Sequence, residues 1–214
     1  MSMNQVVLAL ARQVGGQVQL LGTCFAVGPK QLATALHVIG NDDSNLVVIL
    51  PRTGDFADYQ DATDTAVQVM PVRLAASDNF RDLCILEGPT DTKFPFFTQI
   101  SGSDECPPGV AVLAYGFPHA DQGRMILTLQ PANVGARILL EKSGIKSKHV
   151  VLNVQTRPGQ SGSPVVNTVT GRLCGVITGS YAPAAFGLLL GNINPATLHQ
   201  TSHAISAEYL KDMI

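Results

Sequence analysis

The sequence predicts an all-β protein made of two packed antiparallel β-barrels, with a short helix at the C-terminus. Short runs of Val, Ile, Leu, Thr and Phe alternate with Gly, Pro, Asn and Asp along the chain, a pattern typical of short strands joined by turns. Helical periodicity is weak until the last residues. A segment relatively rich in Pro, Gly and acidic residues, 88–109, separates two halves of roughly a hundred residues each. A β-sandwich fits these strands nearly as well, so the pattern alone leaves both architectures open.

The individual strands follow from the apolar runs and the turn residues between them. We expect strands near residues 5–11, 17–28, 31–35, 46–51, 66–75, 82–87, 109–116, 125–130, 133–141, 149–154, 164–168, 172–181, 186–193 and 202–205. The stretch "LHVIG" predicts one helical turn. The closing "SAEYLKDMI" predicts a helix with Ser206 as its N-cap and with Ile205, Tyr209 and Ile214 on one face. The two barrels are expected at residues 1–95 and 96–214, together forming one domain.

Composition excludes several classes of partner. The chain has 214 residues, of which 45% are hydrophobic and 14% charged, so it can bury a sizeable core. The net charge is −2 and no cluster of Lys or Arg is visible, which argues against nucleic acid or a membrane surface as a partner. No apolar run approaches the roughly 18–20 residues of a membrane-spanning helix.

The cysteines and histidines indicate neither a disulfide framework nor a metal site. The four cysteines contain no C-x-x-C pair, and Cys24, Cys84 and Cys174 stand in apolar contexts that suit buried thiols. We therefore expect free cysteines, a reducing compartment and a cytoplasmic location. The start of the chain makes a poor signal peptide. His199 and His203 are four residues apart but lack an acidic or thiol companion, so no metal and no cofactor is expected.

Three separate segments supply the side chains of a serine nucleophile system. A serine hydroxyl needs a histidine as general base, and the histidine needs a carboxylate to fix its tautomer. "LATALHVIG" places His37 after a strand, "NFRDLCILEGP" places Asp82 before one, and "RPGQSGSPVVN" places Ser161 in a glycine-rich turn. Asp78 is the rival for the carboxylate, but it lacks a following apolar strand. Ser163 is interpreted as a turn residue that supports the next strand.

These three segments resemble the signatures of the chymotrypsin-like (trypsin-fold) serine peptidases. "TALHV", "DLCIL" and "PGQSGSPV" correspond to the boxes around the catalytic histidine, aspartate and serine. The variant P-G-x-S-G-[GS]-P is similar to that of the bacterial HtrA-type and glutamyl-type peptidases. The resemblance implies two six-stranded barrels, with Ser161 as nucleophile, His37 as general base and Asp82 as orienting carboxylate. It also implies an oxyanion hole formed by the backbone N–H groups of Gly159 and Ser161.

Two positions depart from the secreted, zymogen-activated members of that family. Val38 stands where many of them carry a disulfide-bonded cysteine, which agrees with a reducing compartment. Gln160 stands where an aspartate pairs with a newly cut N-terminus, and an amide forms no such ion pair. The resemblance therefore implies that activation by that route is absent.

Specificity is the least determined feature. The resemblance places the S1 pocket at residues 155–158, 177–180 and part of 186–205. Gln155 stands where an aspartate would select Arg or Lys, and Ile177 where glutamyl-type enzymes tend to place their selecting histidine. We expect an uncharged pocket that accepts small or neutral side chains, although a histidine near Thr156 would favour acidic ones. The candidate pocket residues are Gln155, Thr156, Thr178, Ser180 and His203.

The leading hypothesis is thus a serine endopeptidase acting on a protein or peptide substrate, controlled by a regulatory partner or by a larger multidomain context. A catalytically quiet peptide-binding module on the same fold is the alternative. An esterase on another fold would carry G-x-S-x-G with its histidine late in the chain, and the early His37 argues against it.

Overall fold

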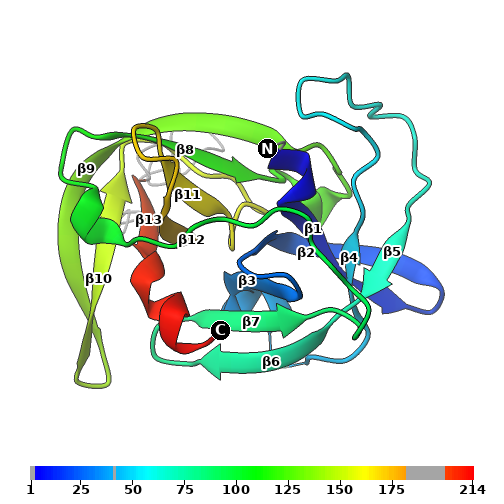
Figure 1. The fold of residues 1–214 in the computed structure, drawn as a ribbon, viewed down its shortest axis with the longest axis horizontal. Helices are drawn as coiled ribbons and strands as arrows, with labels where there is room; N and C mark the ends of the chain where they lie inside the picture. Colours follow the sequence, from blue (N-terminus) through cyan, green and yellow to red (C-terminus); the bar gives the residue numbers. More distant parts are fainter. Residues whose placement is uncertain (1–2, 41, 182–200) are drawn as a thin grey trace, which may run out of the picture.

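The computed structural model describes residues 3–40, 42–181 and 201–214, and it places two antiparallel β units side by side (Figure 1). One is a curled seven-stranded sheet and the other is a closed six-stranded barrel. The helical elements are short: α1 spans Leu36–Ile39, and the 3₁₀ turns η1, η2 and η3 span Met3–Gln5, Ser103–Glu105 and Ala120–Gln122. The predicted all-β class is confirmed.

The N-terminal unit contains seven strands where the family resemblance implies six. In chain order they are β1 Val7–Val14, β2 Gln17–Ala26, β3 Gln31–Ala35, β4 Leu46–Ile49, β5 Val69–Pro71, β6 Arg73–Asp78 and β7 Leu83–Glu87. Their spatial order is β5-β4-β1-β2-β3-β7-β6, so the two edge strands are consecutive in the sequence. The expected strand 66–75 divides at the buried Val72: β5 pairs with β4 and β6 pairs with β7. The sheet therefore curls until its edges meet at one residue.

The C-terminal unit is a closed barrel with the strand order β10-β13-β12-β11-β8-β9. Its strands are β8 Ala111–Gly116, β9 Thr128–Lys142, β10 Ile145–Leu152, β11 Pro164–Asn167, β12 Leu173–Tyr181 and β13 Thr201–Ser206. The expected strands 125–130 and 133–141 are one continuous strand, because β9 pairs with β8 along its first half and with β10 along its second. The expected strand 186–193 lies outside the described residues.

The C-terminus ends in a 3₁₀ helix, η5, at Ala207–Asp212. The expected cap is absent: the Ser206 hydroxyl accepts a hydrogen bond from the Ser103 N–H at 2.9 Å instead of capping the helix. The expected apolar helix face is also wrong, because Ile205 is buried within β13 and Ile214 is half exposed. Leu210 packs into the core of the N-terminal unit, and Figure 1 shows the helix between the two units.

Two clusters of buried apolar side chains hold the units together. The larger fills the curled sheet and extends to Leu173, Val176 and Ile205 of the barrel, so it crosses the junction between the units. The smaller is made of side chains from the barrel strands, among them Val150, Leu152 and Ile177. All four cysteines are free, as the sequence predicts, and Cys106 is buried together with the three for which burial was expected. Within the described residues, no helix is long and apolar enough to cross a membrane.

Candidate active site

The predicted base and carboxylate meet because β3 and β7 pair in one register. Ala35 of β3 lies opposite Leu83 of β7, so the residues just beyond these paired ends come together. The Leu36 N–H donates to the Asp82 carbonyl at 3.0 Å, and the chain then turns into α1, which carries His37. Asp82 has a φ of +57°, a left-handed conformation that aspartate tolerates better than most residues.

Asp82 uses both carboxylate oxygens on His37. Oδ2 lies 2.6 Å from His37 Nδ1, and Oδ1 accepts the His37 backbone N–H at 2.8 Å. This pair of contacts fixes the imidazole with Nδ1–H toward the carboxylate, which leaves Nε2 as the basic nitrogen. The His37 side chain is 45% exposed and the Asp82 side chain 29%, so the imidazole is open to solvent.

Asp78 occupies a different environment. Its carboxylate pairs with Arg81 at 2.7 Å and accepts the backbone N–H groups of Phe80 and Arg81 at 3.0 Å each. Although partial burial acts to raise the pKa of Asp78, the hydrogen bonds and the charge of Arg81 hold that pKa below its ordinary value. Asp78 thus stabilises the turn between β6 and β7, while Asp82 contacts the histidine.

The backbone of β2 holds Ser161 near the turn that carries His37. The Thr23 N–H donates to the Ser161 carbonyl at 3.1 Å. A Cβ atom on the neighbouring Gly22 would lie 2.8 Å from a Val38 methyl group and 3.2 Å from the Ser161 carbonyl oxygen. The turn that carries His37 and the loop that carries Ser161 therefore both approach Gly22 closely. Among the described residues, no hydrogen bond joins the Ser161 hydroxyl to His37.

The loop before Ser161 presents two backbone N–H groups that have no acceptor in the described part of the chain. In a trans peptide the C=O and N–H point in opposite directions. The Pro158 carbonyl accepts the His119 N–H at 2.6 Å, and the Gln160 carbonyl accepts the Ser163 N–H at 3.1 Å. The Gly159 and Ser161 N–H groups therefore point away from these contacts, and neither donates to any described residue. An oxyanion hole needs backbone N–H groups that are free in this way.

Glycine is required on both sides of Ser161. Gly159 has a φ of +89°, and a Cβ there would lie 2.4 Å from the Phe117 carbonyl oxygen. Gly162 has a φ of +83°, and a Cβ there would lie 2.1 Å from the Thr23 carbonyl oxygen. Both positions combine a left-handed conformation with a close backbone approach, so any side chain would displace the loop.

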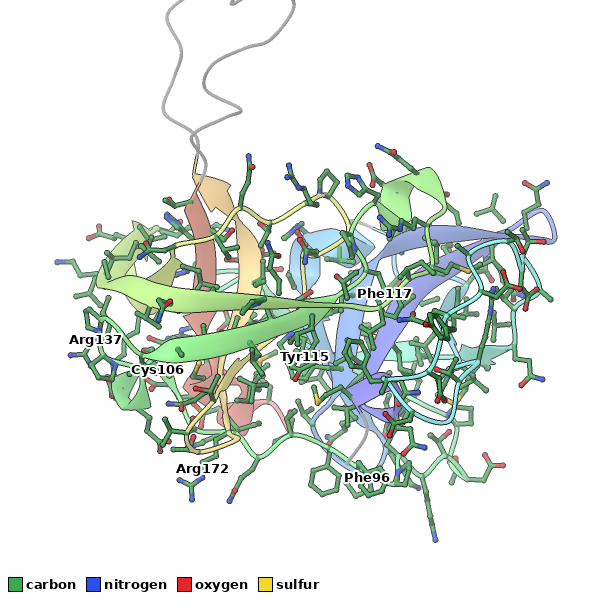
Figure 2. The ribbon with its side chains drawn as sticks, turned by 90° about the horizontal axis from the view of Figure 1, so that it is seen from above. Phe96, Cys106, Tyr115, Phe117, Arg137 and Arg172 are labelled. Carbon is green, nitrogen blue, oxygen red and sulfur yellow. The ribbon has the colours of Figure 1, made fainter. Side chains whose placement is uncertain are left out.

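Thr23 joins the two units at this loop and was not identified from the sequence. Its buried hydroxyl donates to the Gly159 carbonyl at 2.8 Å and accepts the Phe117 N–H at 3.1 Å. Figure 2 shows Phe117 at the junction, where the barrel reaches the N-terminal strands. The only sequence signal is a polar residue inside the apolar strand "GTCFAV".

Ser163 is fully buried, and its hydroxyl finds no partner among the described residues.

The expected S1 residues are partly described. The Ser202 hydroxyl accepts the Thr156 N–H at 2.9 Å, lies 3.0 Å from the Thr156 hydroxyl, and donates to the Val154 carbonyl at 2.7 Å. Gln155 is half-buried, and its carbonyl accepts a hydrogen bond from Gln130 at 2.9 Å. His203 lies in β13, and burial holds its pKa below the ordinary value. The side chain of Ser180 and the positions 186–200 lie outside the described residues.

Open clefts flank the His37–Asp82 pair. One, of about 690 Å³, is lined by residues that include His37, Asp82, Asn79 and Lys142. Lys142 belongs to the β9–β10 hairpin, and its ammonium group donates to the Asn79 carbonyl at 2.7 Å. A second cleft, of about 370 Å³, lies between the hairpin and the 80–82 turn, and Thr178 lines it together with His149. Within the described residues, no group of three or more His, Cys, Asp or Glu could hold a metal ion.

Comparison with protein families places this geometry in context. The model of the trypsin-like peptidase domain matches residues 22–176, which include all three predicted catalytic residues. No curated protein matches the chain.

Solved structures give the same result at the level of the fold. The MamO protease domain from Magnetospirillum magneticum superposes with a TM-score of 0.69 at 18% identity, covering 100% of this chain and 97% of that one. The active form of the Rv3671c protease from M. tuberculosis gives 0.66 at 19% identity, covering 98% and 79%. The HtrA-type protease AlgW, solved with a decapeptide, gives 0.67 at 19% identity, covering 98% and 63%.

Proposed function

Since the chain belongs to the trypsin-like peptidase domain family, we propose that it is a serine endopeptidase that hydrolyses peptide bonds through an acyl-enzyme intermediate. The observation that carries the proposal is the two-point contact of Asp82 with His37, beside a serine loop whose Gly159 and Ser161 N–H groups have no acceptor among the described residues. This combination supplies a base of fixed tautomer and a site for a developing oxyanion.

The chemistry assigned to each group is as follows. His37 Nε2 takes the proton of the Ser161 hydroxyl as Oγ attacks the scissile carbonyl carbon. The carbonyl oxygen becomes an oxyanion and accepts hydrogen bonds from the Gly159 and Ser161 N–H groups. The imidazolium, stabilised by Asp82, then protonates the leaving amine, and the acyl-enzyme forms. Water enters with His37 again as base, and the acid product leaves as Ser161 recovers its proton.

The proposal includes a neutral S1 preference, a cytoplasmic location and control by a partner. Thr156 and Ser202 of the expected S1 region are hydrogen-bonded to each other, and both side chains are uncharged, which supports a neutral preference. Four free, buried cysteines support a reducing compartment. If the purified protein degrades casein at full rate without any partner, control by a partner is ruled out, while the proposed activity stands.

The experiment that tests the activity is labelling with a fluorophosphonate, together with cleavage-site profiling on a peptide library. We expect the probe to modify Ser161 in the wild type, slower modification in His37→Ala, and none in Ser161→Ala. The library should give cleavage after small or uncharged residues. A folded wild type that is neither labelled nor active on the library would overturn the proposal.

A second candidate function is supported by one observation: the Ser161 hydroxyl makes no hydrogen bond to His37 among the described residues. A catalytically quiet module would bind peptides in the cleft beside His37 and Asp82 without cleaving them. Such a protein would bind library peptides equally well before and after Ser161→Ala, with no turnover in either form. However, nucleophile–base hydrogen bonds are often long before substrate binds, so the endopeptidase is favoured.

A further inference from the structure

Gln160, the residue before the predicted nucleophile, is a buried polar residue whose backbone and side-chain groups are engaged in hydrogen bonds. It is 1% exposed. Its backbone N–H donates to the Arg157 carbonyl at 3.0 Å, and its carbonyl accepts the Ser163 N–H at 3.1 Å. Its side-chain Oε1 accepts the Arg157 N–H at 2.7 Å, and Nε2 donates to Gln130 Oε1 at 3.1 Å.

The side-chain contacts form a chain whose direction is fixed at both ends. The first group is the Arg157 backbone N–H, which only donates, and the last is the Gln155 carbonyl, which only accepts. Gln160 and Gln130 lie between them. Each amide must therefore present its oxygen toward Arg157 and its NH₂ toward Gln155. One reversed amide would place two acceptors or two donors face to face, so the chain tolerates a single arrangement.

This series of hydrogen bonds closes the turn that contains Pro158 and Gly159. Arg157 is bonded to Gln160 twice, through its own carbonyl and through its own N–H, so the two residues between them are held in a short loop. The far end of the chain fixes the Gln155 carbonyl to β9 through Gln130. Through these hydrogen bonds, neutral amide groups hold the loop from which the Gly159 and Ser161 N–H groups project.

We infer that Gln160 is the positioning residue that keeps the oxyanion loop in its substrate-ready form, with Gln130 as its anchor and with neutral amides as its partners among the described residues. The inference rests on the proposed function for its catalytic consequence, but the loop geometry itself stands on the contacts above. A neutral chain needs no newly exposed amino group and no pH-dependent ion pair to hold this loop.

Two substitutions at Gln160 test this series of hydrogen bonds, each with a matched control at Gln99. Gln160→Met keeps the length of the side chain but leaves the Arg157 N–H and the Gln130 oxygen without partners. Gln160→Glu keeps the shape, but an ionised carboxylate is only an acceptor, so one junction of the chain must bring two acceptors together whichever way Gln130 turns. Gln99, which is exposed, provides the controls Gln99→Met and Gln99→Glu.

The first readout separates positioning from general destabilisation. We expect Gln160→Met to lower kcat by about 10- to 100-fold, part of the loss expected for a missing oxyanion donor, with KM changed by less than about threefold. The affinity for a peptide boronate, whose tetrahedral adduct occupies the oxyanion hole, should fall by the same factor as kcat. Wild-type kcat in Gln160→Met, or a fall in kcat with unchanged boronate affinity, would overturn the inference.

The second readout uses pH. In the Gln160→Glu variant, the introduced carboxyl group can donate to Gln130 when it is protonated, as the native amide does, and burial raises the pKa of such a carboxyl group. The ratio of kcat for Gln160→Glu to wild-type kcat should therefore rise as the pH is lowered from neutral into the acidic range. Gln99→Glu should keep a constant ratio. A constant ratio for Gln160→Glu as well would contradict the directed chain.

The third readout does not depend on catalysis. In a Ser161→Ala background, adding Gln160→Met should speed amide hydrogen exchange at the hydrogen-bonded N–H groups of residues 160, 162 and 163 at least about tenfold, while adding Gln99→Met should not. Unchanged exchange would overturn the inference. If the wild type is not labelled by a fluorophosphonate while exchange still rises, the endopeptidase proposal fails and the positioning role of Gln160 stands.

Discussion

Replacing Thr23 by valine tests the connection between the two β units at the predicted oxyanion loop. The change keeps the shape of the side chain but removes the hydroxyl that donates to the Gly159 carbonyl and accepts the Phe117 N–H. Thr23 is fully buried, so water cannot replace either contact. Each unpaired polar group costs about 1–3 kcal/mol, so we expect the free energy of unfolding to fall by about 2–6 kcal/mol.

The loss should appear in both stability and turnover. A fall of about 2 kcal/mol lowers the Tm of a chain of this size by about 4–8 °C. Because the Gly159 carbonyl is released, the loop should also move, and kcat should fall by at least about tenfold. Thr23→Ser keeps the hydroxyl and loses only a methyl group, worth about 1 kcal/mol. Urea unfolding and steady-state kinetics measure the two effects. Equal stability and equal kcat in the two variants would refute the reasoning.

Three other predictions follow from contacts elsewhere in the structure. Asp82→Asn should lower kcat about 10⁴-fold, because an amide does not hold the His37 tautomer, whereas Asp78→Asn should change kcat far less; steady-state kinetics distinguishes them. Burial, reinforced by His203, lowers the pKa of His149 from 6.5 to about 4. Between these pH values the unfolded chain therefore binds more protons at His149 than the folded chain, so about 3 kcal/mol of stability should be lost as pH falls from 6.5 to 4. In the His149→Gln variant, the free energy of unfolding measured with urea should depend less on pH over this range. All four cysteines are buried, and burial raises the pKa of the Cys84 thiol to about 12. Because buried thiols are inaccessible, iodoacetamide should modify the cysteines only after unfolding, as measured by mass spectrometry; rapid modification of the native protein would contradict their burial.

The placement of His37 and Asp82 shows how far local patterns carry the prediction. Each lies beside an apolar strand with clear boundaries, and both strands form where the sequence predicts them. Their meeting depends on the pairing of Ala35 with Leu83, which is a property of the sheet. A shift of one residue would have separated them, because successive side chains point to opposite faces.

The division of residues 66–75 shows why the strand count was less predictable. The apolar pattern runs through Val72 without a break, yet β5 and β6 pair with opposite edges of the sheet. That division is decided by the curvature of the whole unit. Similarly, the hydroxyl of Ser206 suits a helix N-cap, but the nearby Ser103 N–H takes it, because the 102–105 segment packs against the end of β13.

By itself, the sequence determined the all-β class and indicated the three segments that carry the proposed nucleophile, base and carboxylate, because these depend on periodicity and local turn chemistry. Only the tertiary structure decided what holds the serine loop. Thr23 is 136 residues from Gly159 in the chain, and Gln130 is 30 residues from Gln160. Hydrogen bonds of this kind join side chains to distant backbone groups or to distant side chains, and no pattern of neighbouring residues encodes their partners.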